Sequence, residues 1–243
     1  MLSIVHVLRQ LVLSPTAFFK QHPPAETFRM SSGIVVLYWI CLTITPLLLG
    51  TLLAGAIDTT VAVDNPHRPP PSICNAENIA ESAKERCAQP KTVDRDVGDL
   101  VQTALVEYVW VGIVLPVIMF PLGWITLYGA GRLGGGTPSL EGTFALAGWA
   151  ALPELVRLVV ALIGLQLTLG EITITDPDPE RMLETLQAAT APIGPILFGA
   201  TVLTLIWQWS LLSGGLSEDA DIQWRVAAVC VAVPVGIIGL FVL

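Results

Sequence analysis

Charged side chains are scarce in this sequence. Lysine, arginine, aspartate and glutamate make up 13% of the residues, whereas soluble domains carry about 25%. The interval between Arg29 and Asp58 contains none of them, and about 20 apolar residues are enough to cross the hydrocarbon core of a bilayer. The chain of 243 residues therefore has room for a handful of membrane spans and their loops, but not for a separate soluble domain of ordinary size.

Basic residues are particularly few. The chain has only three lysines and a formal net charge of -8. No basic stripe is available to release counterions from phosphates, which excludes nucleic acid as a partner. The acidic residues crowd into the loops, and an acidic, lysine-poor surface favours a salt-loving host.

The sequence also lacks the patterns that carry catalysis or cofactor binding. His6, His22 and His67 do not have the spacing of metal ligands, and no serine or cysteine lies in a nucleophile motif. Residues 129–134 match the letters of a dinucleotide fingerprint, but apolar spans and not a βαβ unit flank them. The acidic run at 176–180 lacks the glycine and the closing glutamate of a calcium loop. We predict no catalytic, cofactor-binding or metal-binding residue, and no enzyme.

Long apolar runs are what the sequence does contain. In lipid each backbone polar group must be paired internally, which leaves helices or a closed barrel, and runs without alternation exclude the barrel. We expect an all-α polytopic membrane bundle with about five transmembrane helices. The predicted spans cover residues 32–56, 101–128, 143–169, 190–212 and 223–243, where Ser213 and the two glycines after it end the fourth.

The predicted division is an N-terminal segment, residues 1–30, followed by one membrane domain, residues 31–243. Apolar residues recur at helical spacing over residues 2–13, which predicts an amphipathic helix that lies in the membrane surface or packs on the rest of the protein. Phe18 and Phe19 are expected to anchor the segment at the interface. Residues 58–99 form the longest polar loop, in which good helix formers at 76–88 predict one short surface helix.

Two cysteines in the polar loop bear on sidedness. Arg9, Lys20 and Arg29 precede the first span and favour a cytoplasmic N-terminus, which with five spans puts the C-terminus outside the cell membrane. Cys74 and Cys87 would then share an external loop, where an oxidising environment permits a disulfide. The alternative is two free thiols that face the cytoplasm, and we favour the disulfide because it agrees with the N-terminal charges.

Two charges lie in the middle of the third span. Glu154 and Arg157 are three residues apart, so they face the same side of a helix. Pro153 removes a backbone donor just before them and bends the helix. The pair is either a polar site in the bundle interior or, as we prefer, a structural ion pair that fixes helix register. Glu107 is a possible third member, although a place at the interface fits it better.

The stretch from Gly131 to Pro153, Gly-Arg-Leu-Gly-Gly-Gly-Thr-Pro-Ser-Leu-Glu-Gly-Thr-Phe-Ala-Leu-Ala-Gly-Trp-Ala-Ala-Leu-Pro, resembles the Yip/Yif family of membrane proteins. Its helix–turn motif consists of Gly131, Gly134, Gly135, Gly136 and Pro153. The Pro-x-x-Phe-Phe element at residues 15–19 is also similar, and the resemblance is to the prokaryotic, archaeal branch.

The resemblance implies a five-helix bundle with a cytosolic N-terminus and a role in membrane organisation or trafficking through protein partners. The sequence departs from the family's pattern at the turn, in the first loop and at the N-terminus. Gly-Gly-Gly-Thr-Pro-Ser stands where a lysine and an aromatic residue are frequent, and the cysteine-containing first loop is unusually long. The long N-terminal arm of eukaryotic relatives is missing, so binding of prenylated small GTPases does not carry over.

Two functions remain open at this stage. The first is a non-enzymatic scaffold or adaptor that contacts membrane lipids and other membrane proteins or copies of itself. The second is a small-solute transporter, or a subunit of one, that uses Glu154 and Arg157, because broken helices and intramembrane charges mark substrate paths. Against transport, the sequence shows no internal repeat.

Overall fold

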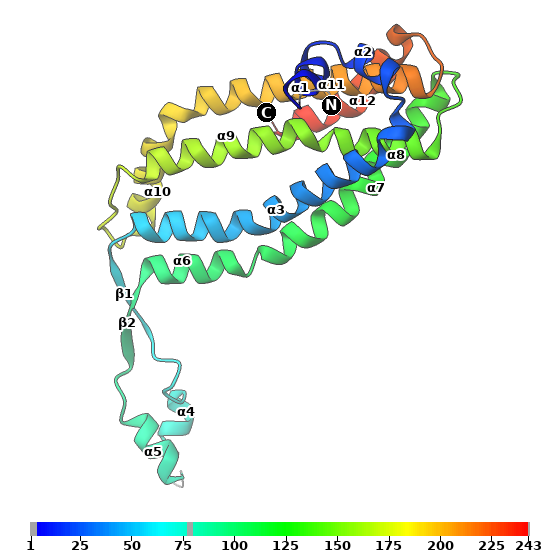
Figure 1. The fold of residues 1–243 in the computed structure, drawn as a ribbon. Coiled ribbons are helices and arrows are strands. Elements are labelled where there is room, and N and C mark those ends of the chain that lie inside the picture. Colours follow the sequence, from blue (N-terminus) through cyan, green and yellow to red (C-terminus); the bar gives the residue numbers. More distant parts are fainter. Residues whose placement is uncertain (1–3, 77–79, 243) are drawn as a thin grey trace.

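The chain folds into an elongated bundle of antiparallel helices with an arm at one end (Figure 1). The computed structural model describes residues 4–76 and 80–242. The bundle consists of α3 (Phe28–Ala56), α6 (Val97–Val106), α7 (Val109–Leu133), α8 (Leu140–Trp149), α9 (Ala151–Leu169), α10 (Pro179–Thr190), η2 (Ala191–Ile193), α11 (Gly194–Asp219) and α12 (Trp224–Val242). We call the end with the turns 134–139 and 220–223 the turn end, and the end with the arm and the loop 170–178 the arm end. The all-α polytopic membrane fold expected from the sequence is confirmed.

Among the described residues, four helical stretches are long and apolar enough to cross a membrane. They are Pro24–Ala56, Val97–Leu133, Leu140–Leu169 and Pro179–Asp219, and the apolar stretch of α12 from Trp224 to Ile237 is shorter. Two of the four contain a break, at 107–108 between α6 and α7 and at Ala150 between α8 and α9. The second break lies one turn before Pro153, whose missing N–H cannot pair with the carbonyl of residue 149.

The polar loop forms an arm that projects from the bundle (Figure 1). Strands β1 (Thr60–Asp64) and β2 (Thr92–Asp96) pair antiparallel, and α4 (Pro71–Cys74) and α5 (Glu81–Cys87) lie at the far end. The short surface helix expected within 76–88 is α5, which begins at Glu81 and has no buried residue, while residues 77–79 lie outside the described residues. In β1, Val61 and Val63 are half-buried and alternate with exposed residues, and Val63 lies opposite Val93, the one valine of β2.

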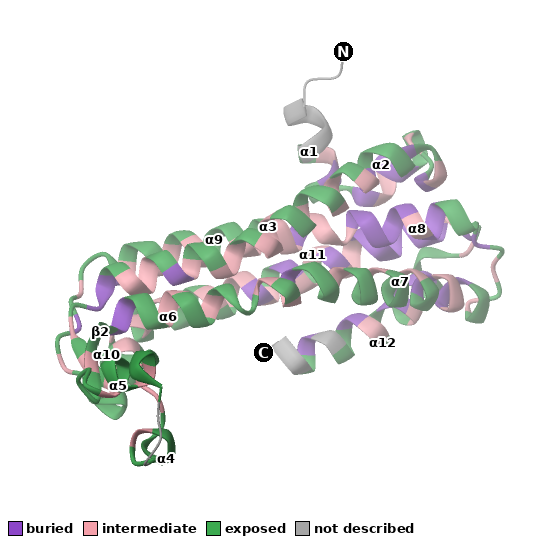
Figure 2. Cartoon of the chain, turned by 90° about the horizontal axis from the view of Figure 1, so that it is seen from below, coloured by how far each residue is buried: buried purple, intermediate pink, exposed green. Residues whose placement is uncertain are grey.

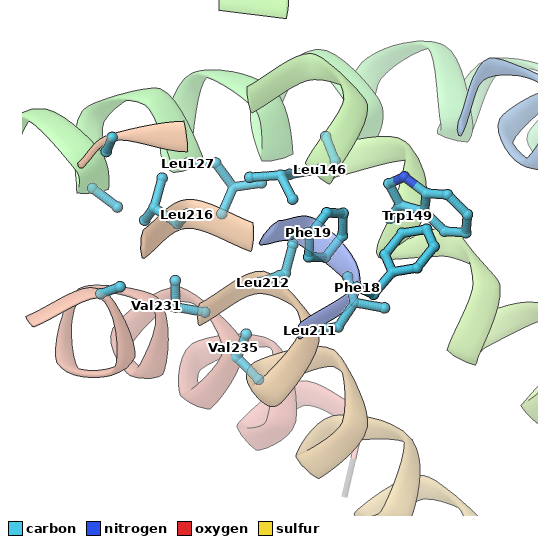
Figure 3. Close-up of a cluster of buried hydrophobic side chains, with 14 of the residues drawn as sticks. Phe18, Phe19, Leu127, Leu146, Trp149, Leu211, Leu212, Leu216, Val231 and Val235 are labelled. Carbon is cyan, nitrogen blue, oxygen red and sulfur yellow. The ribbon is translucent and has the colours of Figure 1, made fainter. Parts of the chain in front are cut away.

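The main hydrophobic core lies at the turn end (Figure 2). Helices α1 (Ile4–Leu13) and α2 (Pro15–Gln21) and the short helix η1 (Pro24–Thr27) pack there against α8 and α11. Figure 3 shows Phe18 and Phe19 close to Trp149, Leu211 and Leu212. Both phenylalanine rings are 1% exposed, so they lie inside the protein and are not interfacial anchors as the sequence suggested.

Helix α11 continues past the end predicted for the fourth span. It runs through Gly214 and Gly215 to Asp219, whereas the prediction ended at residue 212. A Cβ atom at Gly214 would meet Thr16 of α2, and one at Gly215 would meet Leu146 and Phe19. The two glycines thus allow α2 and α8 to pack closely against α11. Glycine has a low helix propensity, and tertiary packing keeps this part of α11 helical.

Candidate functional site

The ion pair of the third span forms within helix α9. Arg157 Nε donates to Glu154 Oε2 at 2.9 Å, and Arg157 Nη2 lies 2.7 Å from the same oxygen. The second carboxylate oxygen, Oε1, accepts from Gln208 Nε2 of α11 at 3.2 Å, and that amide also donates to the Ala150 carbonyl at 2.9 Å. Gln208 therefore links the ion pair to α11 and also bonds the backbone at the α8–α9 break.

The pair lines a cavity of about 280 Å³ between α3, α9 and α11, which we call the polar cavity. Tyr38 and Leu42 of α3, Leu158 and Ala161 of α9, and Leu197 and Thr201 of α11 complete the lining. All lining residues except Thr201 are only partly buried, so the cavity is open to the surroundings of the bundle. A charge at bilayer depth costs several kcal/mol unless it is paired, and here each charge has its partner three residues away.

Glu107 lies apart from this group. It is exposed at the junction of α6 and α7, and it does not line the polar cavity. The side-chain partners of Glu154 and Arg157 in the described residues come from α9 and α11, and Glu107 is not among them.

The glycine motif includes a tight turn that packs against the turn 220–223. Gly135 has φ +80, which favours glycine, and a Cβ at Gly136 would collide with Ala220 and Ile222. Gly131 leaves room for Pro138 in the same way.

A single carboxylate joins the two turns. Asp219 Oδ2 accepts from the Ser139 backbone N–H at 2.9 Å, and Asp219 Oδ1 accepts from the Ser139 hydroxyl at 2.7 Å. Ser139 in turn caps α8 by accepting from the Gly142 N–H at 2.9 Å. The loop between the second and third spans is thereby fixed to the end of α11.

The loop cysteines and the acidic loop lie at the arm end. A disulfide joins Cys74 of α4 to Cys87 of α5. Asp178 caps α10 by accepting from the Glu180 N–H, and Asp176 accepts from the Asp178 N–H and pairs with Arg181. The backbone hydrogen bond from Asp178, together with Arg181, lowers the pKa of Asp176. Within 4–76 and 80–242, no group of three His, Cys, Asp or Glu side chains is placed to hold a metal ion.

Several residues of these sites were not anticipated from the sequence. Tyr38 and Gln208 are isolated polar side chains inside apolar spans, and that isolation is the signal that points to a buried partner. Ser139 and Asp219 are 80 residues apart, and nothing in the sequence connects them. Their contact follows only from how the spans pack.

Comparison with models of known protein families identifies the family of this chain. Residues 9–243 match the family model described as the Yip1 domain. The chain belongs to the Yip1 domain family. The match covers the five apolar helices, the glycine turn and α2, so the Yip1 domain makes up nearly the whole chain and the family resemblance is confirmed. Comparisons with curated proteins and with solved structures give no significant match.

Proposed function

We propose that this Yip1 domain protein is a non-enzymatic membrane scaffold or adaptor. The observation that carries the proposal is the folded surface at the turn end. There α2 and η1 are held in place by buried aromatic rings, and the two turns are joined through Asp219. Such a surface is preorganised, and preorganisation lowers the entropic cost of binding a partner.

Exposed apolar side chains mark where a partner would bind on this surface. Val12 and Leu13 at the end of α1 are 47% and 68% exposed, although Leu11 beside them is fully buried. Exposed apolar groups at the edge of a folded surface are typical of protein contacts. Membrane lipids surround the spans, and the partner is another membrane-associated protein or a second copy of the chain.

The charge distribution supports a cytoplasmic turn end in the cell membrane. The sequence segments at the arm end, 57–99 and 170–190, carry thirteen acidic and six basic side chains, whereas segments 1–31, 132–142 and 216–225 carry five of each. The cytoplasmic leaflet is negatively charged and disfavours an acidic surface. This orientation puts the Cys74–Cys87 disulfide outside, where oxidising conditions maintain it.

The experiment is crosslinking in native membranes, followed by tagged co-purification and identification of what is captured. Deletion of residues 1–30 is unsuitable, because it removes Phe18 and Phe19 from the core. Leu13→Glu is the better variant, and Leu183→Glu is its control, because Leu183 is 56% exposed on α10 at the opposite end. We expect a stoichiometric partner with the wild type and the control but not with Leu13→Glu. Equal capture by both variants, or no partner, would contradict the proposal.

The polar cavity favours transport as the second candidate function. Charged residues beside a broken helix at membrane depth are typical of solute paths. Glu154→Gln is then expected to abolish solute flux in reconstituted vesicles at unchanged protein level. Normal flux in that variant would exclude this function.

A further inference from the structure

Both charges of the polar cavity keep unused hydrogen-bonding capacity. A guanidinium has five N–H donors, and Arg157 directs Nε and Nη2 to the same oxygen of Glu154. Its remaining N–H groups have no protein partner in the described part of the chain. Carboxylate oxygens have about four acceptor sites, and Glu154 Oε1 receives only one further bond, from Gln208 at 3.2 Å.

A third polar group lies in the same lining. Tyr38 is partly buried in α3, and its hydroxyl makes no hydrogen bond to any residue that the structure describes. The rest of the wall is mainly apolar, from Leu42, Leu158, Ala161 and Leu197. Unpaired donors at membrane depth are costly, so a cavity with this lining is suited to a ligand that supplies both acceptors and donors.

The charge of the site selects the class of ligand. Glu154 and Arg157 neutralise each other, so a simple anion or cation would add an uncompensated charge in a medium of low dielectric constant. A zwitterion adds one charge of each sign and leaves the total at zero. We propose that the polar cavity binds a zwitterion, whose anionic group accepts hydrogen bonds from Arg157 and Tyr38 and whose ammonium group donates to Glu154.

The size of the cavity limits what part of the ligand enters. A volume of about 280 Å³ holds a small zwitterionic solute or the head of a zwitterionic phospholipid, but not its acyl chains. The shared chemistry is an anionic group and an ammonium group a few bonds apart. The inference depends on neither proposed function, since it concerns binding alone, and the test measures neither protein capture nor flux.

The test has two arms that separate the two sources. In the first, the protein is reconstituted with equal amounts of phosphatidylethanolamine and phosphatidylglycerol, and retained lipid is identified by native mass spectrometry. In the second, delipidated protein in detergent is titrated with L-alanine by calorimetry, with acetate and methylammonium as singly charged comparisons. We expect retention of the zwitterionic lipid over the anionic one, or binding of alanine but of neither comparison ion.

The matched variants keep the site neutral. Glu154→Gln with Arg157→Gln removes both charges together, so no unpaired charge is left in the membrane, and we expect binding to weaken about tenfold or more. Tyr38→Phe removes one hydrogen bond and is expected to weaken binding by a smaller factor. The control is Asp176→Asn with Arg181→Gln, which removes the exposed ion pair between the acidic loop and α10 and should leave binding unchanged.

Melting temperatures measured alongside show whether each variant is folded. If the charge-free variant does not fold, Tyr38→Phe decides the matter through its own loss of binding. Binding in neither arm, preference for the anionic lipid or for a single ion, or equal binding by the wild type and a folded cavity variant would overturn the proposal.

Discussion

Phe18 shows how one side chain can hold an apparently peripheral segment in the protein. Its ring meets Trp149 edge-to-face at 5.5 Å and Phe19 at 5.1 Å, and it is 1% exposed. We expect Phe18→Ala to lower the free energy of unfolding by about 3–5 kcal/mol, through lost burial and the cavity left behind. Thermal unfolding of the purified protein in detergent measures it. Phe198→Ala is the control, because that ring on α11 is 58% exposed, and equal melting temperatures for the two variants would contradict the prediction.

Gly142 tests the contact between the two turns. A Cβ atom there would run into the Asp219 carboxylate and the Ser139 hydroxyl. We expect Gly142→Ala to cost about 1–3 kcal/mol of unfolding free energy, because it overpacks a site that carries two hydrogen bonds.

The matched control for this change is Gly123→Ala. Gly123 also lies in a helix, α7, but no atom would come within 4 Å of its Cβ. Alanine there should stabilise by about 0.5–1 kcal/mol, through helix propensity. Thermal melts of both variants give the comparison, and the same sign of change in the two would refute the role of Asp219.

Among the elements, the apolar helices were the most predictable from the sequence. Their backbone groups have no alternative to internal pairing in lipid, so length and hydropathy alone indicate a helix. The bounds were less predictable at the turn end, where α11 continues through Gly214 and Gly215. Glycines usually weaken a helix, and only the approach of α2 and α8 explains these two.

The elements outside the membrane were harder to predict. The pairing of β1 with β2 joins segments about 30 residues apart, and strand propensity depends on what a strand packs against. The same limit applies to the polar cavity. The sequence indicates that Glu154 and Arg157 face one side of a helix, but Tyr38 and Gln208 reach them from two other helices. Their contribution follows from packing and not from spacing.

The arm provides a test at the level of elements. The disulfide links α4 to α5, and no core residue of the bundle lies in either helix. A crosslink that closes a short loop stabilises by about 3 kcal/mol, so Cys74→Ser should loosen the arm and leave the bundle intact. We expect faster tryptic cleavage at Lys84, Arg86 and Lys91, with unchanged cleavage in the control Cys41→Ser in α3. Unchanged cleavage in Cys74→Ser would show that the disulfide does not hold the arm.

At the scale of the whole molecule, the proposed orientation follows from charge and from the disulfide together. The test replaces Cys41 and Cys230 with serine and adds one cysteine at Leu133, which is 88% exposed at the turn end, or at Glu171, in the loop at the arm end. We expect a membrane-impermeant maleimide to label the residue 171 cysteine in intact cells. The residue 133 cysteine should react only after the cells are opened. The reverse pattern would invert the orientation and put the Cys74–Cys87 pair in the cytoplasm.

The packing of α2 between α8 and α11 also determines when α2 can reach its folded position during synthesis. Phe18 and Phe19 are made among the first residues, but the surfaces that bury them include Leu146, Leu211 and Leu216, which are made much later. At about 5–20 residues per second, the ribosome needs on the order of 10–40 s to cover that distance. For that time the native surroundings of the two rings are incomplete, because Trp149 is made before the α11 residues that bury the rest of the pair. The rings must be sheltered until then by the bilayer surface, the insertion machinery or a chaperone. Helix α2 can therefore dock completely only when the fourth span is in place. A chain that ends before the fourth span would leave Phe18 and Phe19 exposed, and quality control could detect them.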